Sequence, residues 1–258
     1  MPGNVKISAY IRAKNEARMI ARVIEAARAV ADEVVVVDSG STDGTAQIAE
    51  GAGARVIRRS WLGNGHQKRV GEEACRHDWL LDLDADEILT PELAAEIAAL
   101  FANGEPLEKV FRTPLAIAPP VGPPWTSFGL AERFKLYDRR RFRAPAHAAW
   151  DQFEIPKGER VGRLKAPILH YAFADIGQLA DKVNRNSTTR ARELAPKPAP
   201  VLVLRIFFAF PLYFLKRYAL DGLARGGVYG FAYAAISAYG RWLRDVKMYE
   251  RLLKARGK

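Results

Sequence analysis

An acidic cluster follows an apolar run in the first half of the chain. Residues 79–83 read Trp-Leu-Leu-Asp-Leu, and Asp84, Ala85, Asp86 and Glu87 come next. Carboxylates that stand this close repel one another unless protons or a cation intervene. Asp84 and Asp86 share one face of an extended backbone, since they are two residues apart. The pattern favours Mg²⁺ or Mn²⁺, which prefer oxygen ligands. The alternative is a solvated turn in which Glu87 caps the next helix.

A second acidic residue, Asp38, ends a β-branched run. Residues 34–37 are four valines, which is typical of a strand covered on both faces in a parallel sheet. Residues 39–44 read Ser-Gly-Ser-Thr-Asp-Gly, a turn that can cap a following helix and let a ligand approach its backbone. A carboxylate at a strand end can accept hydrogen bonds from a ribose or a base edge. Asp38 is therefore a candidate nucleotide contact, with a plain capped turn as the alternative.

The elements that would carry these acids alternate between strand and helix. Strands are predicted over residues 5–11, 34–37, 55–57 and 79–83, and helices over 16–30, 45–52, 67–75 and 91–101. This order predicts an α/β fold whose ligands bind beyond the carboxyl ends of parallel strands, where Asp38 and residues 84–86 lie. No Gly-x-Gly-x-x-Gly follows the first strand, so a dinucleotide dehydrogenase is disfavoured.

The rest of the chain divides into two stretches. Residues 105–170 read as loops and mixed strands, and a Pro-rich junction at 195–200 precedes an aromatic and basic end. We therefore predict a domain over 1–195, with halves 1–104 and 105–195, and a helical region over 196–258.

The 258 residues have a formal net charge of +11, which favours a polyanionic partner. A single cysteine indicates a reducing compartment, and the absence of a secretory signal predicts a cytoplasmic location.

The C-terminal region combines bulky apolar side chains with cations. Residues 201–218 are rich in Phe, Leu and Tyr and contain two arginines and a lysine, a mixture that suits the headgroup boundary of a bilayer. The uncharged windows 206–215 and 226–240 are shorter than the roughly 18 residues expected of a membrane span. We expect peripheral attachment to the anionic cytoplasmic face of the inner membrane. Core helices of a soluble protein, or a dimer contact, are the alternatives.

Four motifs occur in a fixed order along the first hundred residues. They are Lys14-Asn15-Glu16, the Val36–Thr45 segment, Gly65-x-Gln67-Lys68 and the Leu81–Glu87 segment. In order and spacing this set resembles family 2 glycosyltransferases, with most likeness to the lipopolysaccharide-core β-glucosyltransferase group. The resemblance implies a GT-A fold, an αβα sandwich with a mostly parallel central sheet, followed here by a helical amphipathic region.

The same resemblance implies a reaction and a donor site. A sugar, with glucose as the first choice, would move with inversion from a UDP-sugar to a lipid-linked saccharide such as the lipopolysaccharide inner core. Glu16 and Asp38 would contact the uridine, and Lys68 would flank the nucleotide.

The resemblance also implies which residues bind the metal and which one accepts a proton. Asp86 would ligate Mg²⁺ or Mn²⁺ directly, Asp84 would lie nearer the ribose or the metal's waters, and His170 would complete metal or diphosphate binding. The attacking hydroxyl needs a carboxylate base. Glu132 stands where the family has an Asp before a Leu-Phe-Arg-Arg-like strand, and Asp151 is the rival.

Two other classes remain open from the residues. One is a nucleic-acid-binding protein, in which the 40 Lys and Arg residues would contact the phosphate backbone. No recognition motif accompanies these residues, so we expect no nucleic acid partner. A sugar-phosphate nucleotidyltransferase would also use Mg²⁺ and paired aspartates. That class begins with a Gly-rich loop, and residues 12–16 contain no glycine.

Overall fold

The structure is a computed structural model that describes residues 5–148, 150–195 and 197–257. Pro196, in the predicted junction, lies outside the described residues. The chain divides into two compact units, Met1–Ala116 with Ala131–His170, and Ile117–Leu130 with Tyr171–Lys258. We call them the sheet unit and the helical unit. The division at His170 differs from the boundary expected at residue 195, because the helix that follows belongs to the second unit.

The sheet unit begins with four parallel strands joined by helices. In space their order is β3-β2-β1-β4. The strands are β1 (Ile7–Ala13), β2 (Glu33–Asp38), β3 (Arg55–Arg58) and β4 (Trp79–Asp84), and the helices are α1 (Ile20–Arg28), α2 (Thr45–Gly51) and α3 (Asn64–Ala74). The predicted βα alternation is confirmed. Two helix starts differ, since residues 17–19 form a turn before α1 and α3 begins three residues early.

The remaining strands extend the same sheet in mixed directions. They are β5 (Glu87–Leu89), β6 (Val110–Ile117), β7 (Ala131–Asp138), β8 (Gly162–Arg163) and β9 (Ile168–His170), with α4 (Pro91–Phe101) after β5. β7 lies antiparallel between β4 and β6, and β5 pairs antiparallel with β9. The β5–β9 pair sets His170 opposite Glu87, although 83 residues separate them in the chain.

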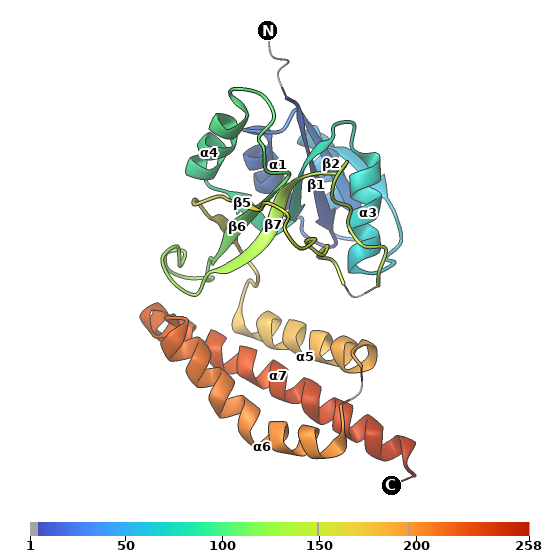
Figure 1. The fold of residues 1–258 in the computed structure, drawn as a ribbon, viewed down its shortest axis with the longest axis vertical. Coiled ribbons are helices and arrows are strands. Elements are labelled where there is room, and N and C mark those ends of the chain that lie inside the picture. Colours follow the sequence, from blue (N-terminus) through green and yellow to red (C-terminus); the bar gives the residue numbers. More distant parts are fainter. Residues whose placement is uncertain (1–4, 149, 196, 258) are drawn as a thin grey trace. The chain divides into compact units, whose positions relative to one another are not determined.

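Helices cover both faces of this sheet, as the αβα prediction required. One apolar core joins the strands to the buried side chains of α1 and α4, and a second core lies on the opposite face. On that face Gly71 of α3 packs directly on the ring of Tyr10. Figure 1 shows α1 and α4 on one side of the strands and α3 on the other.

The helical unit consists mainly of three helices, α5 (Ile176–Glu193), α6 (Ala199–Leu215) and α7 (Gly227–Ala255). A π-helical turn (Lys216–Leu220) and a 3₁₀ turn (Leu223–Gly226) join α6 to α7. One face of α6 packs on α7, where Arg205 lies 2.7 Å from the buried carboxylate of Asp245 and the indole of Trp242 donates to the carbonyl of Ile206 at 3.1 Å.

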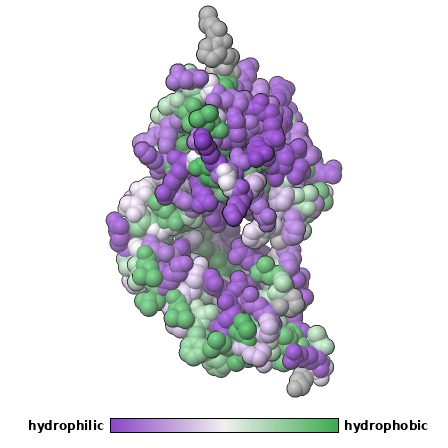
Figure 2. Space-filling view, viewed as in Figure 1, coloured by the Kyte–Doolittle hydropathy of each residue, from purple (hydrophilic) through white to green (hydrophobic). Residues whose placement is uncertain are grey.

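The other face of α6 is exposed and apolar. In Figure 2 hydrophobic side chains gather over the part of the molecule that Figure 1 labels α6 and α7, whereas the sheet unit presents a mainly hydrophilic surface. By length and composition, the continuous helical segment Ala199–Leu220 could cross a membrane. This helix includes three basic residues, so the sequence contains no uncharged window of that length, and attachment at the membrane surface stays a prediction.

Candidate active site

The carboxyl ends of β1, β2 and β4 bring the predicted acids to one edge of the sheet. Ala13 pairs with Asp38, and the neighbouring Arg12 pairs with Asp84 on the other side of β1. Ligands of parallel α/β sheets bind beyond this edge. The strand register therefore explains how Asp38 and Asp84, 46 residues apart, reach the same region.

Asp38 is buried, with 3% of its surface exposed. Its Oδ2 accepts hydrogen bonds from the backbone N–H groups of Gly40 and Ser41, each at 3.1 Å. Its Oδ1 is also buried and has no hydrogen-bond partner among the described residues. Buried polar atoms are nearly always satisfied, so this oxygen is suited to a donor group on a ligand.

The turn before α1 is fastened to the turn that follows Asp38. The backbone N–H of Asn15 donates to Ser41 Oγ and that of Glu16 to Thr45 Oγ1, both at 2.8 Å. Asn15 adopts a left-handed conformation with φ +55°, which asparagine tolerates better than most residues. These contacts hold the backbone of Glu16 beside the second motif.

Lys68 is buried among carboxylates. Its side chain is 3% exposed, and its Nζ lies 2.5 Å from Asp82 Oδ2 and 3.4 Å from Asp151 Oδ2. The charge of this lysine is thus compensated by Asp82, for which the sequence predicted no role. That Lys68 flanks a nucleotide stays a prediction.

Asp84 is paired with Arg12, whose Nη2 contacts Asp84 Oδ1 and lies 3.5 Å from Asp151 Oδ2. Burial opposes ionisation of Asp84, but the charge of Arg12, followed by that of Lys135, outweighs it and holds the pKa of Asp84 below its ordinary value. Asp84 is therefore an ionised partner of an arginine. The sequence did not reveal this pair, because Arg12 belongs to the strand preceding the first motif.

Asp86 and His170 face each other across the β5–β9 pair. His170 Nε2 lies 3.4 Å from Asp86 Oδ2. This separation is compatible with two ligands of one Mg²⁺ or Mn²⁺, which retains waters and phosphate oxygens in its other positions. No cluster of three His, Cys, Asp or Glu residues able to hold a metal occurs within the described parts of the chain. Because Asp84 is paired with Arg12, Asp86 and His170 are the candidate ligands here.

Glu87 and Lys135 form a buried ion pair beneath this loop. Their side chains are 1% and 3% exposed, and Lys135 Nζ lies 2.5 Å from Glu87 Oε2, which also accepts the backbone N–H of Asp84 at 2.9 Å. Burial raises the pKa of Glu87, against the effect of Lys135. The alternative that Glu87 caps a helix in solvent is wrong, since Thr90 caps α4 through Leu93 N–H.

A bulge in β7 coincides with Lys135. Phe111 of β6 pairs with Leu136, but the next residue, Arg112, pairs with Phe134. β7 thus carries one extra residue at this point, and bulges commonly redirect a side chain beside a functional site. Residue types along β7 do not reveal a bulge, so the sequence did not identify Lys135.

The two candidate bases have different surroundings. Asp151 lies within 3.5 Å of both Arg12 and Lys68, and so joins the charged network below Asp84. Glu132 lies on β7, with Arg163 Nη2 2.6 Å from its Oε1 and Arg112 Nη1 3.8 Å from its Oε2. The contacts thus link Asp151, rather than Glu132, to the acidic edge of the sheet.

Two glycines at the start of α3 let the segment before Asp151 approach this helix. The backbone N–H of Gly65 donates to the carbonyl of His147 at 3.0 Å. A Cβ on Gly65 would collide with this carbonyl oxygen and with two others of the same segment, and one on Gly63 would collide with the backbone of Ala148. Glycine is therefore required there by close backbone contact.

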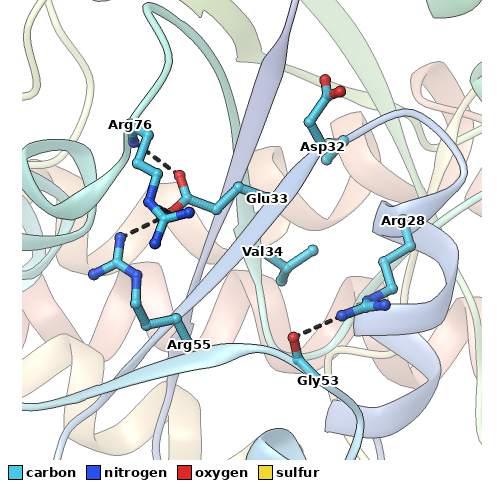
Figure 3. A pocket seen from close by; sticks show the side chains of 8 residues that line it. Arg28, Asp32, Glu33, Val34, Gly53, Arg55 and Arg76 are labelled. Atoms are coloured by element: carbon cyan, nitrogen blue, oxygen red, sulfur yellow. Dashed lines mark hydrogen bonds and ion pairs between the residues drawn. The ribbon is translucent and has the colours of Figure 1, made fainter.

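A cavity of about 340 Å³ lies at the opposite edge of the sheet unit. It is lined at the amino end of β2 by Glu33 and, from neighbouring segments, by Arg28, Arg55 and Arg76 (Figure 3). Glu33 lies 2.9 Å from Arg55 and accepts the backbone N–H of Arg76 at 2.8 Å. The cavity contains none of the motif residues, so it is distinct from the candidate active site.

Comparison with known sequences identifies the motifs as part of a family. A sequence model described as Glycosyl transferase family 2 matches residues 8–144. An uncharacterized glycosyltransferase of Rickettsia felis is 33% identical over 97% of this chain and 92% of its own length. The lipopolysaccharide core biosynthesis glycosyltransferase LpsC of Rhizobium meliloti is 31% identical over 97% of this chain and 94% of its own.

Solved structures show a more limited likeness. Glucosyl-3-phosphoglycerate synthase of Mycobacterium tuberculosis, in complex with Mn²⁺, UDP and glucosyl-3-phosphoglycerate, is 26% identical over 45% of this chain and 44% of its own, with a TM-score of 0.35. Mannosyl-3-phosphoglycerate synthase of Rubrobacter xylanophilus is 25% identical over 45% of this chain and 41% of its own, with a TM-score of 0.38. The likeness spans less than half of each of these chains.

Proposed function

Because the chain belongs to glycosyltransferase family 2, we propose that it is an inverting hexosyltransferase that uses a UDP-sugar, with UDP-glucose as the first choice. Its acceptor is a lipid-linked saccharide such as the lipopolysaccharide inner core, a class supported by the relative named for lipopolysaccharide core biosynthesis. The observation that carries the proposal is the placement of Asp38 and of the Asp86–His170 pair at the carboxyl edge of one sheet.

The donor nucleotide binds between the first two motifs. The unpartnered Oδ1 of Asp38 accepts a hydrogen bond from the uridine, and Glu16 lies on the adjoining turn. Backbone hydrogen bonds to Asp38 Oδ2 fix the carboxylate before the ligand arrives. Such preorganisation lowers the cost of ordering the site on binding.

Asp86 and His170 would hold Mg²⁺ or Mn²⁺ beside the diphosphate of the donor. When bound, such an ion stabilises as a Lewis acid the negative charge that grows on a departing diphosphate. Arg12 compensates Asp84, so that the carboxylate of Asp84 does not repel the phosphates. Lys68 acts in the same way on Asp82.

Asp151 is the base that accepts the proton of the attacking hydroxyl. It is one-third exposed, which leaves it accessible to an acceptor, and its contacts with Arg12 and Lys68 tie it to the donor edge. Glu132 is equally exposed, but its cationic contacts, Arg163 and Arg112, lie on β8 and β6, and no ion pair within the described part of the chain links it to the residues of the donor edge. Asp151 takes this proton as the hydroxyl oxygen bonds to the sugar and the bond between the sugar and the diphosphate breaks.

Attachment to the cytoplasmic face of the inner membrane would give the protein access to a lipid-linked acceptor. The exposed face of α6 carries Leu204, Phe207 and Phe208, while Lys216 follows at its end. The opposite face is fixed to α7 by the Arg205–Asp245 pair. A helix packed in this way is suited to lie in the interface with its apolar face in the lipid.

A ligand screen tests the donor proposal. Thermal stability is measured with a panel of nucleotide sugars, each with Mn²⁺ and with a chelator, because a ligand that binds the native state raises the Tm. We expect UDP-glucose with Mn²⁺ to give the largest rise, and D38N to lose most of it. E25Q, which removes an exposed carboxylate of α1, is the control. A flat response to every nucleotide sugar would contradict the proposal.

A further inference from the structure

A second cavity, of about 320 Å³, opens within the helical unit. It lies where the end of α5, the start of α6 and the end of α7 meet. Apolar and cationic side chains line it together: Ala191, Leu194, Leu202, Met248, Leu252 and Ala255 are apolar, and Arg192, Lys197, Arg251 and Arg256 are cationic. Its volume is at the lower end of the range of small-molecule sites.

The floor of this cavity is apolar. Ala191, Leu202 and Met248 are buried in a small core, against which Leu252 packs. Water gains few hydrogen bonds over such a surface, so a hydrocarbon group would be favoured there. A small hydrophilic anion would leave this surface uncovered.

The rim is positive, and the described residues that line the cavity include no acid. None of the ion pairs among the described residues of the helical unit involves Arg192, Lys197 or Arg256. Arg251 donates to the carbonyl of Ala191 and thereby fixes the end of α5 to α7. A positive rim of this kind favours an anionic ligand.

We propose that this cavity binds an anionic membrane lipid, with its phosphate at the cationic rim and the first part of one acyl chain on the apolar floor. Charge complementarity and the apolar floor together select a ligand that carries both groups. The inference rests on the membrane attachment proposed above, and it gives that attachment a specific lipid site.

The test uses the full chain and a short-chain phosphatidylglycerol kept below its micelle concentration, so that no bilayer is needed. Calorimetric titration should show saturable binding. K197Q/R256Q should weaken it at least about tenfold, since each cation near a lipid phosphate contributes to the attraction. R185Q/K254Q is the matched control, because it removes one arginine and one lysine of the helical unit, both exposed, but leaves the residues that line the cavity unchanged.

Separate variants test the apolar floor. A255W fills the cavity from an exposed position and L194Q makes its wall polar, and both should weaken lipid binding without any change of charge. Inorganic phosphate, titrated in parallel, should bind far more weakly than the lipid.

Four outcomes would overturn the proposal: no saturable binding by the wild type, equal binding of phosphate and lipid, equal losses in the two charge variants, or no effect of A255W and L194Q. Vesicle flotation of the same variants is measured separately, so loss of the lipid site is distinguishable from loss of membrane attachment.

Discussion

Asp84 and Asp86 stand two residues apart, yet different neighbours hold their carboxylates. Arg12 contacts Asp84 from the adjacent strand, whereas Asp86 faces His170 across a strand pair formed with the end of the sheet unit. Glu87 fixes the backbone between them by accepting the N–H of Asp84. One short acidic motif thus contains an ion-paired residue, a candidate metal ligand and a positioning residue.

Removing Lys135 should destabilise the protein strongly. K135M leaves Glu87 buried without its partner, which should lower the free energy of unfolding by about 3–5 kcal/mol. K135M/E87Q removes the buried charge as well, while Gln retains an oxygen for the N–H of Asp84, so it should recover much of that loss. Urea unfolding measures both. If K135M and K135M/E87Q were equally stable, the buried charge of Glu87 would not be the cause of the loss in K135M.

The choice of base gives a second prediction at this scale. D151N should reduce kcat by at least about 100-fold, the usual contribution of a general base, and should leave binding of the UDP-sugar within about twofold. E132Q, its matched control, should keep most of the activity, because Glu132 contacts arginines of β6 and β8 instead. Single-turnover kinetics and donor titration measure the two effects. An inactive E132Q with an active D151N would move the assignment to Glu132.

The sequence could identify the acids but not their partners. Asp38, Asp84 and Asp86 follow from strand ends and from the family motifs. Arg12, which pairs with Asp84, comes from β1, and Lys135, which pairs with Glu87, comes from β7. Only the register of the sheet brings these two side chains to the acidic edge. A charge inside a strand carries no signal of what it will face after folding.

At the scale of elements, the parallel strands β1, β2 and β4 were predictable because each is buried on both faces. The four valines of β2 and the Trp-Leu-Leu run of β4 report that burial directly. β8 and β9 are two and three residues long, and their pairing depends on strands far away in the sequence. Short strands of this kind have no periodicity to read.

Glu33, at the start of β2, gives a pH-dependent prediction about how these elements are joined. Its carboxylate accepts hydrogen bonds from Arg76 N–H, Arg55 and Ser8. Burial opposes ionisation, but these hydrogen bonds outweigh it and lower the pKa of Glu33 below the ordinary 4.5. A lowered pKa in the folded state means that the ionised form stabilises the fold above the unfolded-state value, and that this contribution is lost as the pH falls through the folded-state value.

E33Q should therefore be less stable than the wild type at pH 7, by about 1.5–3 kcal/mol for a hydrogen-bonded charged group. The difference should stay constant down to about pH 5.5 and shrink below about pH 4.5. Chemical unfolding across this range measures it, with E25Q as the control for loss of one exposed carboxylate. A difference that grows toward acidic pH would contradict the assigned direction of the shift.

At the scale of the whole molecule, the two units have opposite surface characters. The sheet unit covers its apolar residues with helices and exposes a mainly hydrophilic surface, whereas the helical unit leaves one face of α6 uncovered (Figure 2). Contiguous exposed apolar surface of this kind marks an interaction site. Its composition was visible in the sequence, but which face is free follows from the Arg205–Asp245 and Trp242–Ile206 contacts.

Membrane attachment through this face is testable by vesicle flotation at low salt. Phe207 is 72% exposed on α6, and Leu107, in the sheet unit, is 78% exposed. F207E should lower vesicle binding at least about tenfold, because burial of a phenylalanine in lipid contributes roughly 1.5–3 kcal/mol. L107E adds the same charge to an equally exposed apolar residue and should bind as the wild type does. If the wild type remained in the soluble fraction, or if both variants lost binding equally, the exposed face of α6 would have to be explained by a protein partner.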